Sequence, residues 1–253
     1  VIAGTSVTEF NNLQISTGAA LSITAAANRA QVRSQFTNNG IFNSTASTVI
    51  EFTAVGTIAG VPTIITTVEI ADYASLTLDN ADDLTTIQFL TVPANAALHL
   101  RDSSILRLPG LTITGTFTAS GSTPTVRAFV GFFNFEINDA NASVDIDQLN
   151  LHNLGFNGVS VSPVLGVANL DIDGANFTRD AGSPPGFRYI SFGFPPTANY
   201  SFIGCSFDAN TQYNIQTPVG TADRRVTMSG TGGDAGNETY ENDAGSGGVI
   251  NPG

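Results

Sequence analysis

The sequence predicts an all-β fold in which short parallel strands stack into a solenoid of about nine turns. A short motif recurs along the chain, in which two apolar residues flank a third residue and an alanine stands two positions before the first of them. Copies follow one another at 20 to 30 residues, which is the period of solenoid repeats. Gly, Asn, Asp, Ser and Thr separate the copies, and such residues typically bound short strands.

Six copies keep the alanine, and three weaker ones fill the gaps between them. The clear apolar pairs are Leu21/Ile23, Leu76/Leu78, Leu98/Leu100, Val144/Ile146, Leu170/Ile172 and Tyr200/Phe202. A seventh pair, Val226/Met228, has Arg224 in place of the alanine. The weaker pairs are Ile50/Phe52, Val68/Ile70 and Leu111/Ile113. Counted together, they predict about nine stacked turns.

Strand geometry predicts where these side chains point. Successive residues of a strand face opposite sides, so both apolar residues of a pair are expected inside the coil and the middle residue outside. Stacked turns then build apolar columns, and the small alanine fits where the chain bends. Helix has little support, because the composition is rich in Gly, Thr, Ser and Asn.

The repeated segments LDIDGANF (residues 170–177) and YSFIGCSF (residues 200–207) resemble rungs of the right-handed parallel β-helix of the pectin-lyase-like superfamily. The resemblance runs from roughly Leu13 to Met228 and concerns the rung pattern, so it implies a right-handed coil and no particular reaction. Pectate lyases of this fold resemble one another in an Arg base and a Lys-bearing motif, and this chain contains no Lys. The Gly-His-Gly and Arg-Ile-Lys elements of polygalacturonases are also absent.

The pattern predicts one β-helix domain over residues 1–228, with an N-terminal strand or cap, and a Gly-rich acidic tail over residues 229–253. The segment from Ala25 to Phe36 is the best helical candidate, and two alternatives stay open for it: a short capping helix or a covering loop. In the tail, Val249 and Ile250 could add a strand to the edge of a neighbouring molecule. No amphipathic helix is predicted to close either end of the coil.

Charge narrows the classes of partner. The chain has 21 acidic and 9 basic residues and a formal net charge of −12, which repels nucleic-acid phosphates and anionic membranes. No apolar run approaches the roughly 18 residues of a membrane span. A polysaccharide, a divalent cation or a second copy of the chain remains an admissible partner.

The strongest candidate site is acidic. Aligning the rungs stacks Asp145 near Asp171 and Asp147 near Asp173 on one outer face. Carboxylates on adjacent strands, roughly 5 Å apart, repel one another unless a cation or a raised pKa relieves them. Calcium takes oxygen ligands in loose geometry, so these four aspartates are the candidate calcium patch, with screening by water or a neighbouring Arg as the alternative.

Other chemistry-bearing residues give weaker signals. His99 is expected in the same outer column as Asp145, and His152 beside the inward Leu151, with neither having a Ser or Cys partner in view. Cys205 is the only cysteine, which excludes a disulfide framework within the chain and a CxxC metal site. The glycine-rich segment at residues 230–236 lacks the Lys and the helix of a phosphate-binding loop, so a linker is expected there.

The composition favours an extracellular or cell-surface location. A polar but weakly charged surface without Lys and with one Cys suits resistance to proteolysis. The chain begins at Val1 and has no leader-like segment, as expected of a processed product. Asn-x-Ser/Thr sequons are present, and their glycosylation depends on the source; they lie at Asn43, Asn141, Asn176, Asn199 and Asn237.

The leading hypothesis is therefore a structural protein, a β-solenoid that assembles end to end into an extracellular filament or acts as an adhesive rod. One alternative is a carbohydrate-active lyase or hydrolase with a groove beside the four aspartates. Its sugar platform would consist of Phe132, Phe133, Phe135, Phe187, Tyr189, Phe192 and Phe194. A third interpretation is a phage-type receptor-binding spike, for which trimerisation would be expected.

Overall fold

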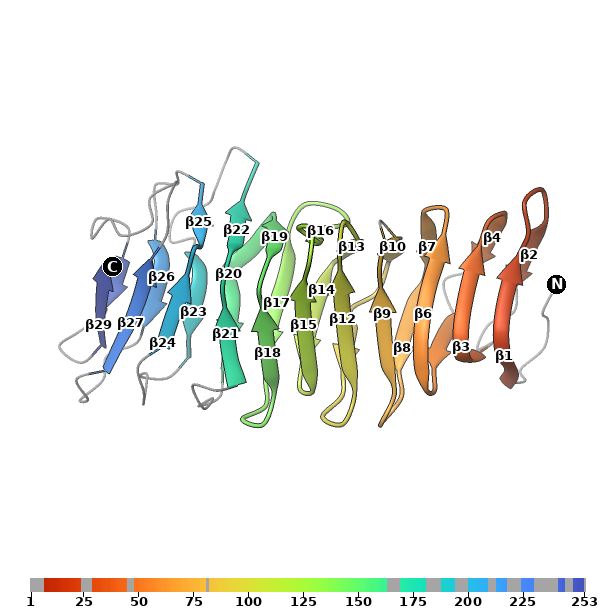
Figure 1. Cartoon of the computed structure of the whole chain (residues 1–253), viewed down its shortest axis with the longest axis horizontal. Helices are drawn as coiled ribbons and strands as arrows, with labels where there is room; N and C mark the ends of the chain where they lie inside the picture. The colour runs from red at the N-terminus through yellow and green to blue at the C-terminus, as the bar shows by residue number, and fades with distance from the viewer. Residues whose placement is uncertain are drawn as a thin grey trace.

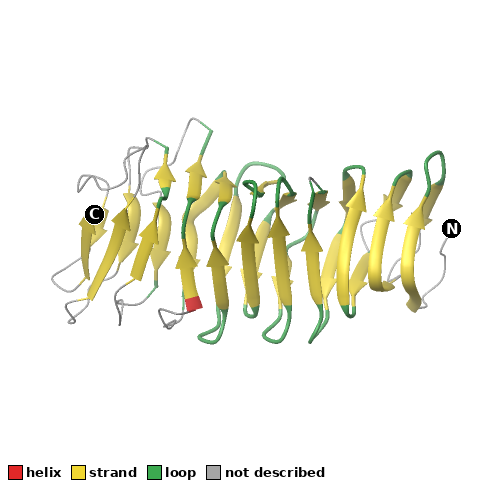
Figure 2. Ribbon diagram, viewed as in Figure 1, coloured by secondary structure: helices red, strands yellow, loops and turns green. Residues whose placement is uncertain are grey.

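The protein is an elongated β-solenoid of about eight turns with almost no helix, which confirms the predicted all-β parallel β-helix (Figure 2). The first strand and the last strand lie at opposite ends of the long axis (Figure 1). The computed structural model describes residues 7–23, 29–44, 48–80, 82–162, 169–180, 188–193, 200–208, 213–217, 224–229, 241–243 and 248–252. No helix within these residues is long and apolar enough to cross a membrane.

Three long parallel sheets make the walls of the coil, and a typical turn contributes one strand to each. Sheet 1 contains β1 (Val7–Ile15), β3 (Arg29–Asn38), β5 (Val49–Phe52), β6 (Val55–Gly60), β8 (Thr67–Ile70), β9 (Ser75–Leu78), β12 (Ala97–Arg101), β15 (Thr116–Ser120), β18 (Ser143–Ile146) and β21 (Leu170–Ile172). Sheet 2 contains β7 (Thr63–Ile65), β10 (Asp83–Thr86), β13 (Ile105–Leu108), β16 (Thr125–Ala128), β19 (Leu149–His152), β22 (Ala175–Thr178) and β25 (Ser206–Phe207). Sheet 3 contains β11 (Leu90–Val92), β14 (Gly110–Ile113), β17 (Phe133–Ile137), β20 (Leu154–Val161), β23 (Arg188–Phe192), β26 (Tyr213–Thr217) and β28 (Glu241–Asp243).

Two short sheets complete the ends of the coil. Near the N-terminus β2 (Ala20–Ile23) pairs with β4 (Ile41–Ser44). Near the C-terminus β24 (Tyr200–Ile203), β27 (Arg224–Ser229) and β29 (Gly248–Pro252) form a parallel sheet that lies beside β21 and so prolongs sheet 1. The stack thus continues past residue 228, and Val249 and Ile250 lie in a strand that pairs with β27 of the same chain.

The predicted alternation holds along the central strands. In β12, Leu98 and Leu100 are fully buried while His99 between them is half-buried on the outer side. Register stacks Leu98 on Phe117 and then on Val144. Phe117 also meets Phe135 of sheet 3 edge to face, with ring centroids 5.4 Å apart. Full burial of such a side chain contributes about 1.5–3 kcal/mol, so these columns hold the turns together.

Two kinds of bend shape each turn. The alanine of the repeat ends a tight turn before sheet 1, because the amides of Ala74, Ala96 and Ala142 donate to the carbonyl three residues earlier and all three side chains are buried. After sheet 1 the chain passes through a left-handed residue, such as Asn80 or Gly174 with φ of 50° and 62°. A Cβ at Gly174 would lie 2.5 Å from the carbonyl oxygen of Asp147, so only glycine fits there.

Two expectations need correction. Residues 29–36 form neither a capping helix nor a covering loop; they lie in β3, where Ala30, Val32 and Phe36 are buried and the strand pairs with β1. Residues 25–28 lie outside the described part of the chain. Tertiary pairing decides the local structure here, because a weak helical pattern cannot compete with ladders to β1, β5 and β6.

The other correction concerns which segments make a turn. Leu111/Ile113 lies in β14 of sheet 3, in the same turn as Leu98/Leu100, so it adds no turn of its own. The sheet 1 strand that follows β12 is β15, with Phe117 and Ala119 inside. The repeated motif does not mark β15, because alanine takes its second inward position.

Tyr73 marks a strained turn and gives a test of the backbone. It has φ of 63° and an 82% exposed side chain, and left-handed backbone costs a bulky residue energy that asparagine largely avoids. We expect Tyr73→Asn to raise the free energy of unfolding by about 0.5–1 kcal/mol in urea denaturation. Tyr73→Phe is the matched control and should leave it unchanged; a loss of stability in the Asn variant would show that the ring itself stabilises the turn.

Candidate functional site

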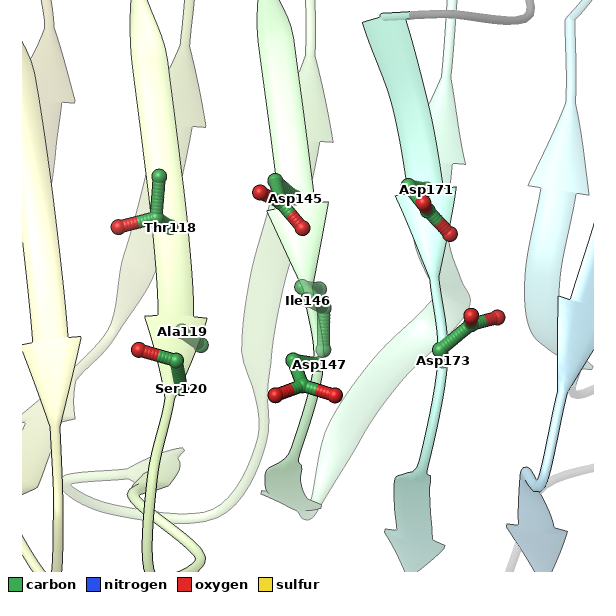
Figure 3. Close-up of a pocket in the computed structure, with 8 residues that line it drawn as sticks. All are labelled: Thr118, Ala119, Ser120, Asp145, Ile146, Asp147, Asp171 and Asp173. Carbon is green, nitrogen blue, oxygen red and sulfur yellow. The ribbon is translucent and has the colours of Figure 1, made fainter.

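A concave surface lies on the outside of sheet 1. It is a groove of about 440 Å³ over three neighbouring strands, β15, β18 and β21. Its walls are Thr118, Ala119, Ser120, Asp145, Ile146, Asp147, Asp171 and Asp173. Figure 3 shows the four carboxylates on two adjacent strands, with the hydroxyls of Thr118 and Ser120 on the third. The predicted acidic patch and the groove are therefore the same surface.

Strand register brings the aspartates together. Asp145 and Asp171 are direct partners in the β18–β21 ladder, at the outward middle position of each triplet. Asp147 and Asp173 follow two residues later, just past the ends of these strands. Alternation along a strand puts positions 145 and 147 on the same face, and the turn-to-turn repeat copies that spacing.

Asp173 already has a structural role. Its Oδ1 accepts a hydrogen bond of 2.8 Å from the amide of Ile203 in the next turn. At an equivalent bend, Asp102 Oδ1 accepts one of 3.3 Å from the amide of Ser122. An aspartate at this bend thus satisfies a backbone donor of the following turn, which leaves fewer lone pairs of Asp173 for a ligand.

The carboxylates are not neutralised by side chains in the described residues, where none of the four forms an ion pair. Desolvation by burial, and then the charges of the three neighbouring aspartates, raises the pKa of Asp171. The cause is that both effects disfavour the ionised form. Screening by a neighbouring Arg, the alternative raised for this patch, has no support among these groups.

The groove does not have the shape of a ready-made metal cage. Within the described residues, no three His, Cys, Asp or Glu side chains converge on one point where an ion would fit. A cation would instead bridge a pair such as Asp145 and Asp171, with water filling its remaining coordination positions. Calcium binding at Asp145, Asp147, Asp171 and Asp173 therefore stays a prediction.

The two histidines lie on different sheets and do not meet in the groove. His99 is in the same outer column as Asp145, as expected, but Thr118 stands between them and pairs with the Nδ1 of His99 at 2.8 Å. Burial, together with Arg101, lowers the pKa of His99. His152 is on sheet 2, with Nδ1 2.8 Å from Thr178 Oγ1 and Nε2 3.5 Å from Asp180. Both rings therefore bridge adjacent turns.

The proposed sugar platform is wrong for most of its members. Phe133, Phe135, Tyr189 and Phe192 are buried in the core, and Phe187 and Phe194 lie outside the described residues. Only Phe132 is exposed, at 47%, and the guanidinium of Arg179 covers its ring at 4.2 Å. Side chains alternate between the two faces of a strand, and these four aromatic side chains lie on the face that points into the core.

The sequence did not predict a second groove, of about 360 Å³. It lies where β8 and β11 run side by side without forming a ladder, and its walls are Thr67, Val68, Glu69, Ile70, Phe89, Thr91 and Pro93. Glu69 is bound there to Arg29 at 2.5 Å. The groove results from a local failure of strand pairing, and no motif in the sequence signals such a failure.

The remaining candidates are ordinary structural residues. Cys205 is buried, which raises the pKa of its thiol to about 12, so the thiolate is scarce at neutral pH. Of the sequons, Asn43 and Asn141 are exposed, whereas Asn176 donates its side-chain amide to Asn150 at 3.2 Å. Asn199, Asn237 and the glycine-rich segment lie outside the described residues.

No family model, no curated protein and no solved structure matches this chain. The arrangement of its own residues is therefore what supports any function.

Charge repulsion in the groove gives a pH-dependent prediction. Folding raises the pKa of Asp171. The contribution of this carboxyl group to the free energy of unfolding is therefore favourable below its unfolded pKa of about 3.9, and it is lost as the pH rises through the folded pKa. We expect Asp171→Asn to raise the free energy of unfolding by about 0.2–1 kcal/mol at pH 7, a small effect because the site is exposed, and by less at pH 3. Denaturant melts at both pH values measure this.

The control for that comparison is Asp72→Asn, which removes a carboxylate from an exposed turn away from the groove. This variant should not show the same pH-dependent increase in the free energy of unfolding. Equal gains in both variants would mean that overall negative charge, not the stacking of aspartates, is responsible.

Calcium supplies the next test. Titration calorimetry with CaCl₂ is expected to detect binding to the unmodified chain and none after the double substitution Asp145→Asn with Asp171→Asn, because these two carboxylates are direct register partners. The Asp72→Asn variant should bind as the unmodified chain does. Absence of binding in the unmodified chain would remove the calcium prediction.

Proposed function

We propose that this protein is an extracellular or cell-surface structural protein whose rods associate end to end into a filament or adhesive fibre. One observation carries the proposal: the extended sheet 1 begins with β1 and ends with β29, and within the described residues neither strand has a partner on its outer edge. Unpaired strand edges are templates for pairing with another chain.

The direction of the strands favours an open chain of copies over a closed pair. Every ladder in sheet 1 and its continuation is parallel, so β1 and β29 point the same way at opposite ends of the rod (Figure 1). A second copy shifted along the axis presents a parallel strand to the free edge. Such a contact joins two different surfaces and repeats without closing, which gives fibres.

The core reaches the N-terminal end of the rod. Leu13 and Ile15 on β1 are buried at 8% and 3% exposure although they belong to the outermost strand. A copy that adds a strand there prolongs the apolar columns instead of starting new ones. Because these two side chains are already buried, the joint depends mainly on the backbone hydrogen bonds of the new ladder.

Sedimentation velocity and negative-stain electron microscopy over a concentration series test the proposal. We expect filaments with an axial repeat of about 53 Å, because eleven strands from β1 to β29 stack along sheet 1 and its continuation at about 4.8 Å each. Particles that stay monomeric at every concentration would contradict it, and a discrete trimer would favour the receptor-binding spike.

A pair of variants localises the contact. Asn12→Lys puts a charge on the outermost strand, a common means of blocking edge pairing, and should raise the concentration needed for filaments. Thr77→Lys makes the same change in the middle of sheet 1, where β6 and β12 already flank the strand, and should leave assembly unchanged.

The acidic groove favours a second candidate, a carbohydrate-active protein, and the resemblance to the pectin-lyase-like superfamily supports the same proposal. Acid–base cleavage of a glycosidic bond requires at least two carboxyl groups, and Asp145 and Asp171 supply two on adjacent strands. Turnover of an acidic polysaccharide should then disappear in the Asp145→Asn, Asp171→Asn double variant and persist in Asp72→Asn. Equal turnover in all three proteins, or none in the unmodified protein, would exclude this candidate.

A further inference from the structure

We infer that the joint between two copies is made by sheet 1 alone, with β29 of one copy paired in parallel to β1 of the next and Asn251 in register with Asn12. This inference rests on the proposed end-to-end assembly and specifies its contact surface.

Register along the rod identifies the residues that meet. From the N-terminal end, one outward column of sheet 1 runs through Asn12, Gln35, Thr57, Thr77, His99, Thr118, Asp145 and Asp171. At the C-terminal end the column continues through positions 201, 227 and 251. Position 201 follows position 171 because the same two turns are offset by 30 residues on sheet 2, where Asn176 pairs with Ser206. The column therefore has asparagine at both free ends.

Continuity of the core favours this register over its neighbours. The adjacent register column begins with the buried Leu13 and reaches position 252 through positions 202 and 228. Continuing the same register places position 252 opposite Leu13. A slip by one residue would turn every side chain of the new strand to the wrong face.

The chain itself shows that stacked asparagines bond in this geometry. Asn150 and Asn176 are direct partners in the β19–β22 ladder, and Nδ2 of Asn176 donates to Oδ1 of Asn150 at 3.2 Å. Ladders of side-chain amides stabilise in-register stacks of parallel strands. The register places Asn12 and Asn251 at matching positions across the joint.

Charge separates sheet 1 from sheet 3 as a joining surface. In this register β29 faces residues 9–13 of β1, where Glu9 is the one ionisable residue and is paired with Arg33 at 2.6 Å, and the sequence of β29 contains no ionisable residue. On sheet 3 the register position after the fully buried Ile215 is Glu241, and Asp243 follows two residues later. Two acidic residues at these register positions make β28 a poor surface for joining copies of a chain with a net charge of −12.

Cysteine cross-linking in the full chain tests the register. Adjacent parallel strands are about 4.8 Å apart, within the Cα separation of about 4.4–6.8 Å that a disulfide spans. We expect the double variant Asn12→Cys with Asn251→Cys to shift from the monomer band to a ladder of multiples on a non-reducing gel. A mixture of the two single variants should stop at dimers. Native Cys205 is buried and should not contribute.

A matched control variant, together with sedimentation of the same proteins, distinguishes a wrong register from an absence of end-to-end assembly. Asn12→Cys with Thr227→Cys puts the second thiol one strand further inside, about 9.6 Å away, and should not cross-link. Filaments of the double variant without disulfides, or cross-linking of Gln14→Cys with Asn251→Cys instead, would overturn the register and leave end-to-end assembly standing. Monomers in sedimentation without any cross-link would overturn both.

Discussion

Parallel backbone pairing between successive turns is the constraint on which the rest of this structure depends. Each strand of a turn must align with its counterparts above and below, so every side chain acquires neighbours of the same position in the repeat. Apolar positions then form continuous columns such as Leu98, Phe117 and Val144, and outward positions form columns on the surface. The bends follow from the same requirement, since alanine and left-handed residues recur where the chain must turn in little space.

The acidic groove is a consequence of this repetition. A repeat that copies an outward aspartate from one turn to the next stacks like charges, as at Asp145 and Asp171, and desolvation by the neighbouring strands raises the pKa of Asp171. At Asp173 the same repetition serves the fold, because its carboxylate binds a backbone amide of the following turn. The groove thus combines a structural aspartate with carboxylates that form no ion pair among the described residues.

The geometry also explains why the ends of the rod and its sides are different kinds of surface. Along the sides, backbone donors and acceptors are consumed by the ladders, so recognition depends on side chains such as those of the groove. At the ends, within the described residues, β1 and β29 have no ladder partner on their outer edges, so a parallel strand could pair with either. The described part of this protein carries such a strand at each end of sheet 1 and its continuation, and this is the basis of the proposed self-association.

The sequence by itself determined the fold class, the inward columns and the aspartate stack, because these depend on alternation and period, which are local properties of the chain. Only the tertiary structure decided which segments share a turn, that residues 29–38 form a strand, and that most of the candidate aromatic platform is core. It also revealed the groove between β8 and β11 and the hydrogen bond that occupies Asp173. These features depend on contacts between residues 20 to 30 positions apart, whose register is set by pairing energy summed over whole strands and not by any single motif.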